Sequence, residues 1–363
     1  MKKIISVVGA RPNFMKIAPL HRAFLPHAGE LMHRICHTGQ HFDENMSKIF
    51  FEELELPHPD FYLGVGSGSH AEQTARIMTG FEKVLLVEKP DLVVVPGDVN
   101  STMAASLVAS KMGIPIAHIE AGLRSFDRTM PEEINRMVTD VLAEYLFVSE
   151  PSGLTNLRRE GIPEEKIYHV GNIMIDSLTH YLPKTEKSTI LHNLGLQAGD
   201  YVLVTFHRPN NVDLVVKLTE VVNFLNQLSE RKKVVFPVHP RTRINLEQYR
   251  LISKLERRVI LTDPLGYIDF LTLTRQALLV ITDSGGIQEE TTWLGVPCIT
   301  VRDNTERPVT VDEGTNVLAG TNLNRVQEQA MDRLQGKIKK GKIPEYWDGK
   351  TANRIVQILL SKL

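Results

Sequence analysis

Residues 282–290 read Thr-Asp-Ser-Gly-Gly-Ile-Gln-Glu-Glu, and they indicate the fold class more clearly than any other part of the chain. They join a short apolar run at residues 278–281, which predicts a buried strand, to a predicted helix. Ser284 is a favourable N-cap, and Gly285 and Gly286 leave room for a ligand at the positive end of the helix dipole. Glu290 falls about two turns into the helix. The stretch predicts a strand–turn–helix unit that binds a phosphate, the alternative being an ordinary capped helix after a tight turn.

The same alternation of β-branched runs and amphipathic segments extends along all 363 residues. Such alternation is typical of parallel sheets covered by helices on both faces. Strands are expected near residues 4–8, 33–37, 91–95, 114–119, 145–149 and 167–170, and again near 201–206, 233–238, 258–262, 278–282, 297–301 and 316–319. Six strands followed by six more predict an α/β protein with two Rossmann-like domains facing a central cleft. The domains are expected at residues 1–171 and 172–350, with a helix at 351–363 packing back on the first.

The composition is that of an ordinary globular protein, with 42% hydrophobic residues, 23% charged residues and a formal net charge of −1. A nearly neutral chain has no long-range attraction for nucleic acid or an anionic membrane. No apolar run approaches the ~20 residues that span a bilayer, and residues 1–8 do not resemble a signal peptide. Cys36 and Cys298 lie far apart beside apolar residues, so we expect buried reduced thiols. These features predict a cytoplasmic protein without nucleic-acid or membrane partners.

Acidic residues gather at the expected ends of strands, where open α/β sheets bind their ligands. Asp98 and Glu120 end two consecutive predicted strands, and Glu132 opens a predicted helix. Carboxylates that share a partly dry site are suited to general acid–base catalysis. The alternatives are that Asp98 caps the helix beginning near Ser101 and that Glu132 only complements the helix dipole. Neighbouring Glu133 is expected to be a solvated surface residue.

Basic residues also follow the expected ends of strands. Arg11 follows the first predicted strand and Lys16 lies one turn into the next helix, so both are expected to place positive charge beside a bound diphosphate. His207 and His239 each end a strand of the second domain, where a histidine donates to a phosphate oxygen or transfers a proton. The chain lacks the glycine-rich motif of nicotinamide enzymes, the Walker phosphate loop and the nucleophile elbow. We therefore expect chemistry without a cofactor or metal.

Taken together, these motifs resemble the non-hydrolysing UDP-N-acetylglucosamine 2-epimerase family, whose fold is the two-domain, glycosyltransferase-B-like one. The resemblance covers nearly the whole chain and rests on the order and spacing of short segments. They are Gly-Ala-Arg-Pro at 9–12, Lys-Ile-Ala-Pro-Leu at 16–20, Thr-Gly-Gln-His at 38–41, Pro-Gly-Asp at 96–98, His-Ile-Glu-Ala-Gly-Leu-Arg at 118–124, Pro-Glu-Glu-Ile-Asn-Arg at 131–136, Gly-Asn at 171–172, Thr-Phe-His-Arg at 205–208, Pro-Val-His-Pro at 237–240, residues 282–290, and Arg-Asp-Asn-Thr-Glu-Arg-Pro at 302–308.

The resemblance implies an isomerase that eliminates UDP across carbons 1 and 2 of the sugar. It implies a 2-acetamidoglucal intermediate, re-addition of UDP with the proton on the opposite face, and UDP-N-acetylmannosamine as a precursor of surface polysaccharide. By matching position, the implied catalytic residues are Asp98, Glu120, Glu132 and His207. The implied residues that bind UDP or substrate are Arg11, Lys16, His239, Ser284, Gly285, Gly286, Glu290 and Arg307. Because the proton on carbon 2 is barely acidic, donors around the departing diphosphate should lower much of the barrier.

Bacterial members of the family use a second UDP-N-acetylglucosamine as an activator. The corresponding positions are Gln40, His41 and Arg208. The residues that follow His41, together with Phe206 and residues 209–211, differ from the commoner bacterial patterns, so the need for an activator stays open. Family members are usually homodimers, and the resemblance implies a homodimer here.

Several alternatives stay open. A hydrolysing relative would release N-acetylmannosamine and UDP, and a related epimerase would act on a UDP-linked diacetamido-uronic acid. Segments 9–12 and 302–308 favour the non-hydrolysing type, whereas the substituents on sugar carbons 3 and 6 are not encoded in a recognisable pattern. A retaining glycosyltransferase shares the fold but has no use for three clustered carboxylates. A catalytically silent UDP-sugar sensor would not need the complete set of catalytic positions.

Overall fold

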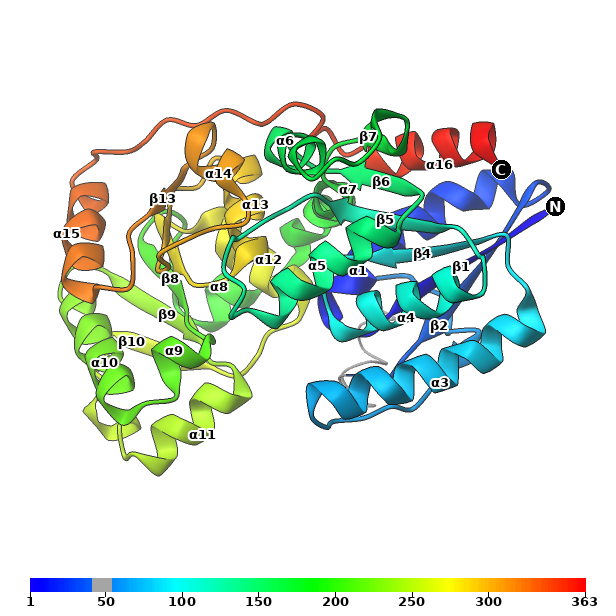
Figure 1. Ribbon diagram of the computed structural model, residues 1–363. Helices are drawn as coiled ribbons and strands as arrows, with labels where there is room; N and C mark the ends of the chain where they lie inside the picture. Colours follow the sequence, from blue (N-terminus) through cyan, green and yellow to red (C-terminus); the bar gives the residue numbers. More distant parts are fainter. Residues whose placement is uncertain (41–53) are drawn as a thin grey trace. The chain divides into compact units, whose positions relative to one another are not determined.

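The computed structural model describes residues 1–40 and 54–363 (Figure 1). The chain divides into two compact units. Unit 1 comprises Met1–Ser177 and Glu345–Leu363, and unit 2 comprises Leu178–Pro344. The division lies within helix α7 (Ile173–Tyr181), a few residues beyond the boundary expected after Gly171. Both units are α/β with parallel sheets, which confirms the predicted fold class.

Within the described residues, unit 1 has a seven-stranded sheet in the order β3-β2-β1-β4-β5-β6-β7, with parallel neighbours throughout. Its strands are β1 (Lys2–Val8), β2 (Leu31–His37), β3 (Phe61–Tyr62), β4 (Leu92–Pro96), β5 (Ile116–Ala121), β6 (Tyr145–Val148) and β7 (Ile167–His169). The six strands expected here are confirmed. Strand β3 was not expected, because two residues are too few to show a strand periodicity.

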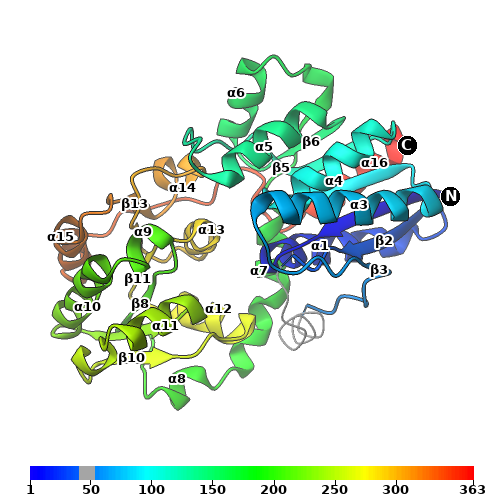
Figure 2. The same ribbon diagram turned by 60° about the horizontal axis from the view of Figure 1, so that its bottom comes forward.

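Helices cover both faces of this sheet (Figures 1 and 2). They are α1 (Arg11–Phe24), α3 (His70–Glu88), α4 (Asn100–Lys111), α5 (Pro131–Leu142), α6 (Pro151–Arg159), α7 and α16 (Thr351–Lys362), with short 3-10 turns η1 (Leu25–His27) and η2 (Glu164–Lys166). Helices α3 and α4 pack on the apolar face that includes Ile5 and Val93. Helix α16 packs against α1, so the end of the chain is part of unit 1.

Within the described part of unit 2, the sheet has six strands in the order β10-β9-β8-β11-β12-β13, and neighbouring strands are again parallel. The strands are β8 (Tyr201–Thr205), β9 (Lys233–Pro237), β10 (Val259–Thr262), β11 (Leu279–Thr282), β12 (Cys298–Thr300) and β13 (Asn316–Leu318). The helical segments are η3 (Leu182–Lys187), α8 (Ile190–Asn193), α9 (Pro209–Val212), α10 (Val215–Ser229), α11 (Pro240–Gln248), η4 (Ile252–Lys254), α12 (Tyr267–Gln276), α13 (Gly285–Leu294), α14 (Pro308–Asp312) and α15 (Leu323–Leu334). All six strands expected in this half are confirmed.

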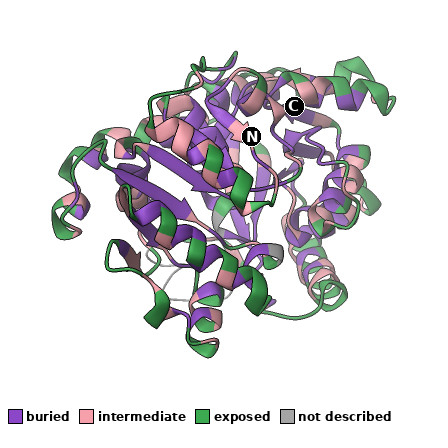
Figure 3. Ribbon diagram, turned by 90° about the vertical axis from the view of Figure 1, so that its left-hand side faces the viewer, coloured by how far each residue is buried: buried purple, intermediate pink, exposed green. Residues whose placement is uncertain are grey.

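The strands of unit 2 form the middle of its core, as their buried colouring in Figure 3 shows. Val202 and Val204 of β8 face α10 and α15, whereas Tyr201 and Leu203 face α8 and α12. Strand side chains alternate between the two faces, and both faces are covered by helices. The near-continuous apolar runs of these strands follow from that double burial.

The strand orders reverse direction once in each sheet. In unit 1 the reversal lies at β1, between β2 and β4, and in unit 2 it lies at β8, between β9 and β11. Ligands of open α/β sheets bind beyond the carboxyl ends of the strands at such switch points. The residues that follow β1, β4, β8 and β11 are therefore the ones that the topology places at a binding edge.

The structure also bears out the expectation for the two cysteines. Cys36 and Cys298 are buried and free, and burial raises the pKa of both thiols to about 12. No helix among the described residues combines the length and the apolar character that crossing a bilayer requires.

Candidate active site

The binding edge of unit 1 brings Glu120 and Lys16 together beside Gly97, the residue before Asp98. Gly97 turns the chain between β4 and Asp98 with a φ of 67°, which suits glycine. A Cβ atom on Gly97 would lie 2.8 Å from Lys16 Nζ and 3.4 Å from Glu120 Oε2. The Lys16 ammonium and the Glu120 carboxylate form an ion pair, and their side chains are only 7% and 4% exposed. Lys16 thus contacts one of the proposed catalytic carboxylates, a pairing that the sequence did not indicate.

The orientation of Glu120 depends on an irregularity in β5. The pairing of β5 with β6 shifts register between Ile119 and Ala121, and Glu120 has a φ of 73°. A bulge of this kind redirects a side chain at the end of a strand. Positive φ at a residue with a Cβ costs of order 1–3 kcal/mol, and such strain clusters at functional sites. The local geometry therefore supports a functional role for Glu120.

Arg136 links Asp98 to the beginning of α5. Its Nη2 atom lies 2.5 Å from Asp98 Oδ2, and Asn135 Nδ2 donates to the Asp98 carbonyl oxygen at 2.8 Å. The alternative that Asp98 caps the next helix is wrong, because the N-cap of α4 is Val99. Sequence reasoning missed Arg136, although its position one turn after Glu133 is the spacing of a helical ion pair.

Glu133 is buried, so the prediction of a solvated residue is wrong. It is 1% exposed, and its carboxylate accepts hydrogen bonds from Ser125 N, Ser125 Oγ and Phe126 N, each at 2.9 Å. It also forms an ion pair with Arg136 at 2.9 Å. Glu133 therefore holds the loop before α5, while neighbouring Glu132 is half-buried on the first turn of the helix.

A fully buried histidine supports the Gly97 turn from behind. His118 Nδ1 lies 2.6 Å from Asp140 Oδ1 and its Nε2 lies 2.8 Å from the Gly97 carbonyl oxygen. Both ring nitrogens face oxygen atoms that accept hydrogen bonds, so the ring connects Asp140 to the Gly97 turn. Burial acts to raise the pKa of Asp140, but His118 and Arg124 outweigh it and hold that pKa below its ordinary value. This network fixes the turn that carries Asp98.

In unit 2, β11 leads directly into α13, as expected. Ser284 is the N-cap, although its side chain makes no capping hydrogen bond. A Cβ atom on Gly286 would have no described atom within 4 Å, whereas one on Gly285 would lie 2.7 Å from Arg307 Nη1 and 2.8 Å from Glu306 Oε1. The two glycines therefore differ in purpose. Gly285 allows Arg307 and Glu306 to approach the helix, and Gly286 leaves its N-terminus accessible.

Charged side chains surround the start of α13. Arg307 is 7% exposed and forms ion pairs with Glu289, at 2.7 Å, and with Glu306. Glu290 is 5% exposed and accepts a hydrogen bond from Tyr267 Oη at 3.2 Å. A cation beside an accessible helix N-terminus is an arrangement that binds phosphate groups.

The two proposed phosphate-contacting histidines lie close together. The ring centroids of His207 and His239 are 6.3 Å apart. His207 Nδ1 lies 2.7 Å from Asp283 Oδ1, and Arg208 donates its backbone N–H to Asp283 Oδ2 at 3.0 Å. Asp283 thereby connects the end of β8 with the beginning of α13. The sequence stretch included Asp283, but nothing in its local pattern indicated this partner.

The structure describes only some of the remaining residues that were predicted to bind ligands. Arg11 is the first residue of α1, and its side chain lies outside the described part of the chain, as does the whole of His41. Gln40 is buried, and its Oε1 accepts hydrogen bonds from Ser101 N at 3.1 Å and Ser101 Oγ at 2.7 Å. Gln40 thus contacts the first turn of α4, and Arg208 Nε donates to the Asp283 carbonyl oxygen at 3.1 Å. The role of both residues in binding an activator stays a prediction.

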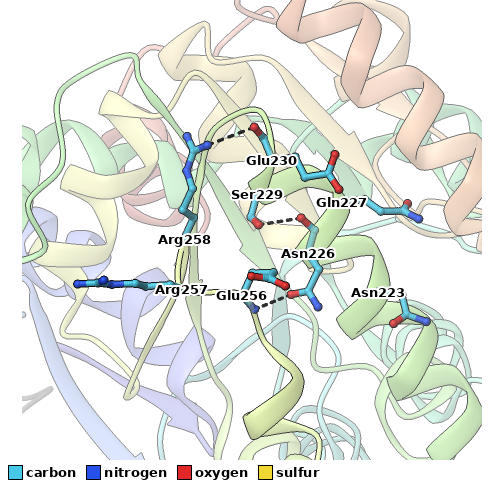
Figure 4. Close-up of a pocket in the computed structure, with 8 residues that line it drawn as sticks. All are labelled: Asn223, Asn226, Gln227, Ser229, Glu230, Glu256, Arg257 and Arg258. Atoms are coloured by element: carbon cyan, nitrogen blue, oxygen red, sulfur yellow. Dashed lines mark hydrogen bonds between the residues drawn. The ribbon is translucent and has the colours of Figure 1, made fainter.

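A polar pocket of about 530 Å³ lies elsewhere in unit 2 (Figure 4). It is lined by residues at the end of α10 and by residues 256–258, which precede β10. This places it at the amino ends of β9 and β10, the edge opposite the one that carries His207 and Ser284. None of the residues predicted to bind substrate lines it.

Comparison with known proteins agrees with this arrangement. A family model described as UDP-N-acetylglucosamine 2-epimerase matches residues 25–360. The chain belongs to this family. The family's UDP-N-acetylglucosamine 2-epimerase from Methanocaldococcus jannaschii is 45% identical over 364 residues, which is 98% of each chain.

The solved structure of this relative and a second member of the epimerase family are also similar to the chain. The crystal structure of the Methanocaldococcus jannaschii enzyme in complex with UDP-N-acetylglucosamine and UDP superposes with a TM-score of 0.91, covering 99% of this chain and 100% of the other. The UDP-2,3-diacetamido-2,3-dideoxy-D-glucuronate 2-epimerase from Pseudomonas aeruginosa is 43% identical over 360 residues, which is 98% of this chain and 99% of that protein. The present chain is thus an enzyme of the epimerase family with two parallel-sheet domains.

Proposed function

We propose that this enzyme interconverts UDP-N-acetylglucosamine and UDP-N-acetylmannosamine by elimination and re-addition of UDP. The observation that supports this most is the accessible start of α13 beside Arg307, in a family whose Methanocaldococcus jannaschii member was crystallised with UDP-N-acetylglucosamine and UDP. A site that holds a departing diphosphate is what an elimination mechanism needs.

In this proposal unit 2 binds the nucleotide. The backbone N–H groups at Gly285 and Gly286 and the Arg307 guanidinium contact the diphosphate, and Glu290 accepts hydrogen bonds from the ribose hydroxyls. His207 donates to a diphosphate oxygen as the bond from carbon 1 breaks. These donors stabilise charge that develops only as UDP departs, so they lower the barrier instead of merely tightening substrate binding.

Unit 1 handles the proton of carbon 2. One carboxylate among Asp98, Glu120 and Glu132 accepts that proton, the electrons of the C–H bond form the double bond between carbons 1 and 2, and the electrons of the C–O bond leave with UDP. A carboxylic acid on the opposite face returns a proton when UDP adds back. Ion pairs with Arg136 and Lys16 hold the Asp98 and Glu120 side chains at fixed positions. Two acidic groups explain how one site reaches both faces of the sugar.

A UDP-linked diacetamido-uronic acid is the second candidate substrate. The Pseudomonas aeruginosa relative is 43% identical and the Methanocaldococcus jannaschii relative 45%, so overall identity favours the simpler sugar only slightly. Both UDP-sugars should be assayed in parallel. We further propose that the product supplies surface polysaccharide synthesis.

Isotope exchange in heavy water is the direct test. The enzyme is incubated with UDP-N-acetylglucosamine, and both recovered epimers are examined for deuterium at carbon 2. Deuterium in both, without net release of free sugar, supports the proposal. Accumulating N-acetylmannosamine would instead indicate a hydrolase, and UDP binding without exchange would indicate a sensor.

The carboxylates are tested individually by Asp98→Asn, Glu120→Gln and Glu132→Gln. Each variant should lose turnover by a factor of at least 100 while its affinity for UDP stays within a few-fold of wild type. Glu82→Gln on α3 is the matched control, because that carboxylate is solvent-exposed. Exchange at the wild-type rate in all three variants would remove these residues from the mechanism.

Two further proposals follow from membership of the family. We propose a homodimer, to be tested by measuring the molecular mass in solution. We also propose activation by a second UDP-N-acetylglucosamine through Gln40, His41 and Arg208. Reactions started with UDP-N-acetylmannosamine alone should then show a lag that a trace of UDP-N-acetylglucosamine removes.

A further inference from the structure

Asp283 is the most heavily hydrogen-bonded carboxylate among the described residues of the β8 and β11 loops. It is completely buried, and Oδ2 accepts from His207 N at 3.0 Å, Arg208 N at 3.0 Å and Asn211 Nδ2 at 2.9 Å. Its other oxygen, Oδ1, lies 2.7 Å from His207 Nδ1. Oδ1 also accepts from His207 N at 3.2 Å. Oδ2 therefore faces two backbone N–H groups and the Asn211 amide, and Oδ1 is the oxygen that faces the imidazole.

The carboxylate stays ionised in this position. Burial acts to raise the pKa of Asp283. The hydrogen bond and charge of His207, followed by the hydrogen bonds from Arg208 N and the Asn211 amide, outweigh it, so the pKa lies below its ordinary value. An ionised acceptor requires hydrogen on His207 Nδ1. The His207 side chain is 42% exposed, so Nε2 is on the part of the ring that a ligand can reach.

We infer that Asp283 is a positioning residue that fixes the protonation of His207 for its contact with the departing diphosphate. This inference rests on the proposed function. Asp283 is also the residue immediately before Ser284, the N-cap of α13. A single buried side chain therefore sets the imidazole relative to the helix N-terminus that binds the same diphosphate. With Nδ1–H held by Asp283, the cationic ring donates from Nε2 as UDP leaves and accepts the hydrogen back as UDP returns.

The variant Asp283→Asn reverses the direction of the hydrogen bond between residue 283 and His207 Nδ1, and it leaves the shape of the side chain nearly unchanged. The amide oxygen can keep the three anchoring N–H donors, which leaves the amide nitrogen facing His207 Nδ1. An amide N–H can only donate, so Nδ1 must become an acceptor and the ring hydrogen moves to Nε2. The cationic ring, which has hydrogen on both nitrogens, is then disfavoured.

Kinetics separate this role from a purely structural one. We expect Asp283→Asn to lower kcat about 100-fold or more, the range of a lost proton-transfer group, while KM and UDP affinity change only a few-fold. In the background of His207→Ala, the same substitution should cause no further loss, because Asp283 acts through His207. Asn211→Ala is the matched control. It removes one donor to Oδ2 but leaves the Oδ1–His207 contact, so its loss in kcat should stay below about tenfold.

Imidazole ¹⁵N shifts give a readout that does not depend on turnover. In the neutral imidazole of wild-type His207, the hydrogen should be on Nδ1, and Asp283→Asn should move it to Nε2. The His207 resonances are assigned by their loss in His207→Ala. The inference is overturned if the wild type already carries hydrogen on Nε2, if Asp283→Asn keeps wild-type kcat, or if its loss is as large in the His207→Ala background. The wild-type shifts decide the question even if Asp283→Asn does not fold. A wild type without isotope exchange at carbon 2 would refute the proposed function but leave the ¹⁵N test of Asp283 intact.

Discussion

Glu132 and Glu133 are adjacent glutamates on the first turn of α5, and we expect opposite consequences from replacing each by glutamine. Glu133 is 1% exposed and makes three hydrogen bonds to residues 125–126 together with the ion pair to Arg136. Glutamine at this position turns an amide N–H₂ group toward groups that donate hydrogen bonds themselves. It also removes one of the two carboxylates that form ion pairs with Arg136. Glu132 is half-buried on the same turn.

Removing one partner of a buried ion pair costs about 3–5 kcal/mol. Arg136 keeps Asp98 as a second partner, so we place Glu133→Gln at the lower end, about 3 kcal/mol. For a domain of this size, each kcal/mol lowers the melting temperature by roughly 2–4 °C, which gives a fall of about 6–12 °C. Glu132→Gln should change stability by no more than ~0.5 kcal/mol.

Calorimetry and isotope exchange on the two variants test this expectation together. Glu133→Gln should melt early, and Glu132→Gln should melt with the wild type yet lose turnover. The reasoning would be refuted if Glu133→Gln melted within about 1 °C of wild type, because the expected destabilisation lowers the melting temperature by roughly 2–4 °C for each kcal/mol. A Glu132→Gln protein that is the less stable of the two would refute it as well.

Three further predictions concern packing, pH and thiol reactivity. Gly285→Ala should destabilise unit 2 by about 1–2 kcal/mol, because the new Cβ meets Arg307 and Glu306. Gly286→Ala should raise the free energy of unfolding by ~0.5 kcal/mol, measured by thermal unfolding, and should weaken UDP binding. Equal behaviour of the two variants would contradict the roles assigned to the two glycines. Burial raises the pKa of Asp176 to about 6, so the folded state binds this proton more tightly than the unfolded state does. The protonated group stabilises the folded state by about 3 kcal/mol below pH ~4, and this contribution is lost as the pH rises through 6. Relative to wild type, Asp176→Asn should therefore gain stability between pH 4 and 7 in urea titrations. The two buried cysteines should not react with a thiol reagent until the protein unfolds, and rapid labelling of the native protein would show otherwise.

Local sequence patterns were sufficient for most of the fold. Apolar runs and their spacing predicted twelve strands, and the Ser284-Gly285-Gly286 turn predicted the start of α13. These features depend on residues within a few positions of each other, where strand and helix periods are expressed. The same locality explains the misses. Strand β3 has too few residues to show a strand periodicity. The burial of Glu133 depends on hydrogen bonds to Ser125, which lies eight residues earlier in an irregular loop that has no helix or strand periodicity.

By itself, the sequence determined the two α/β domains, the order of their elements, and the strand ends that carry Asp98, Glu120 and His207. Which of these side chains meet was decided only by tertiary structure. Asp283 and His207 are 76 residues apart, and Lys16 and Glu120 are 104 apart. The physical reason is that a parallel sheet brings the ends of distant strands to one edge, and contacts between the loops there depend on strand order and register, which no local period encodes.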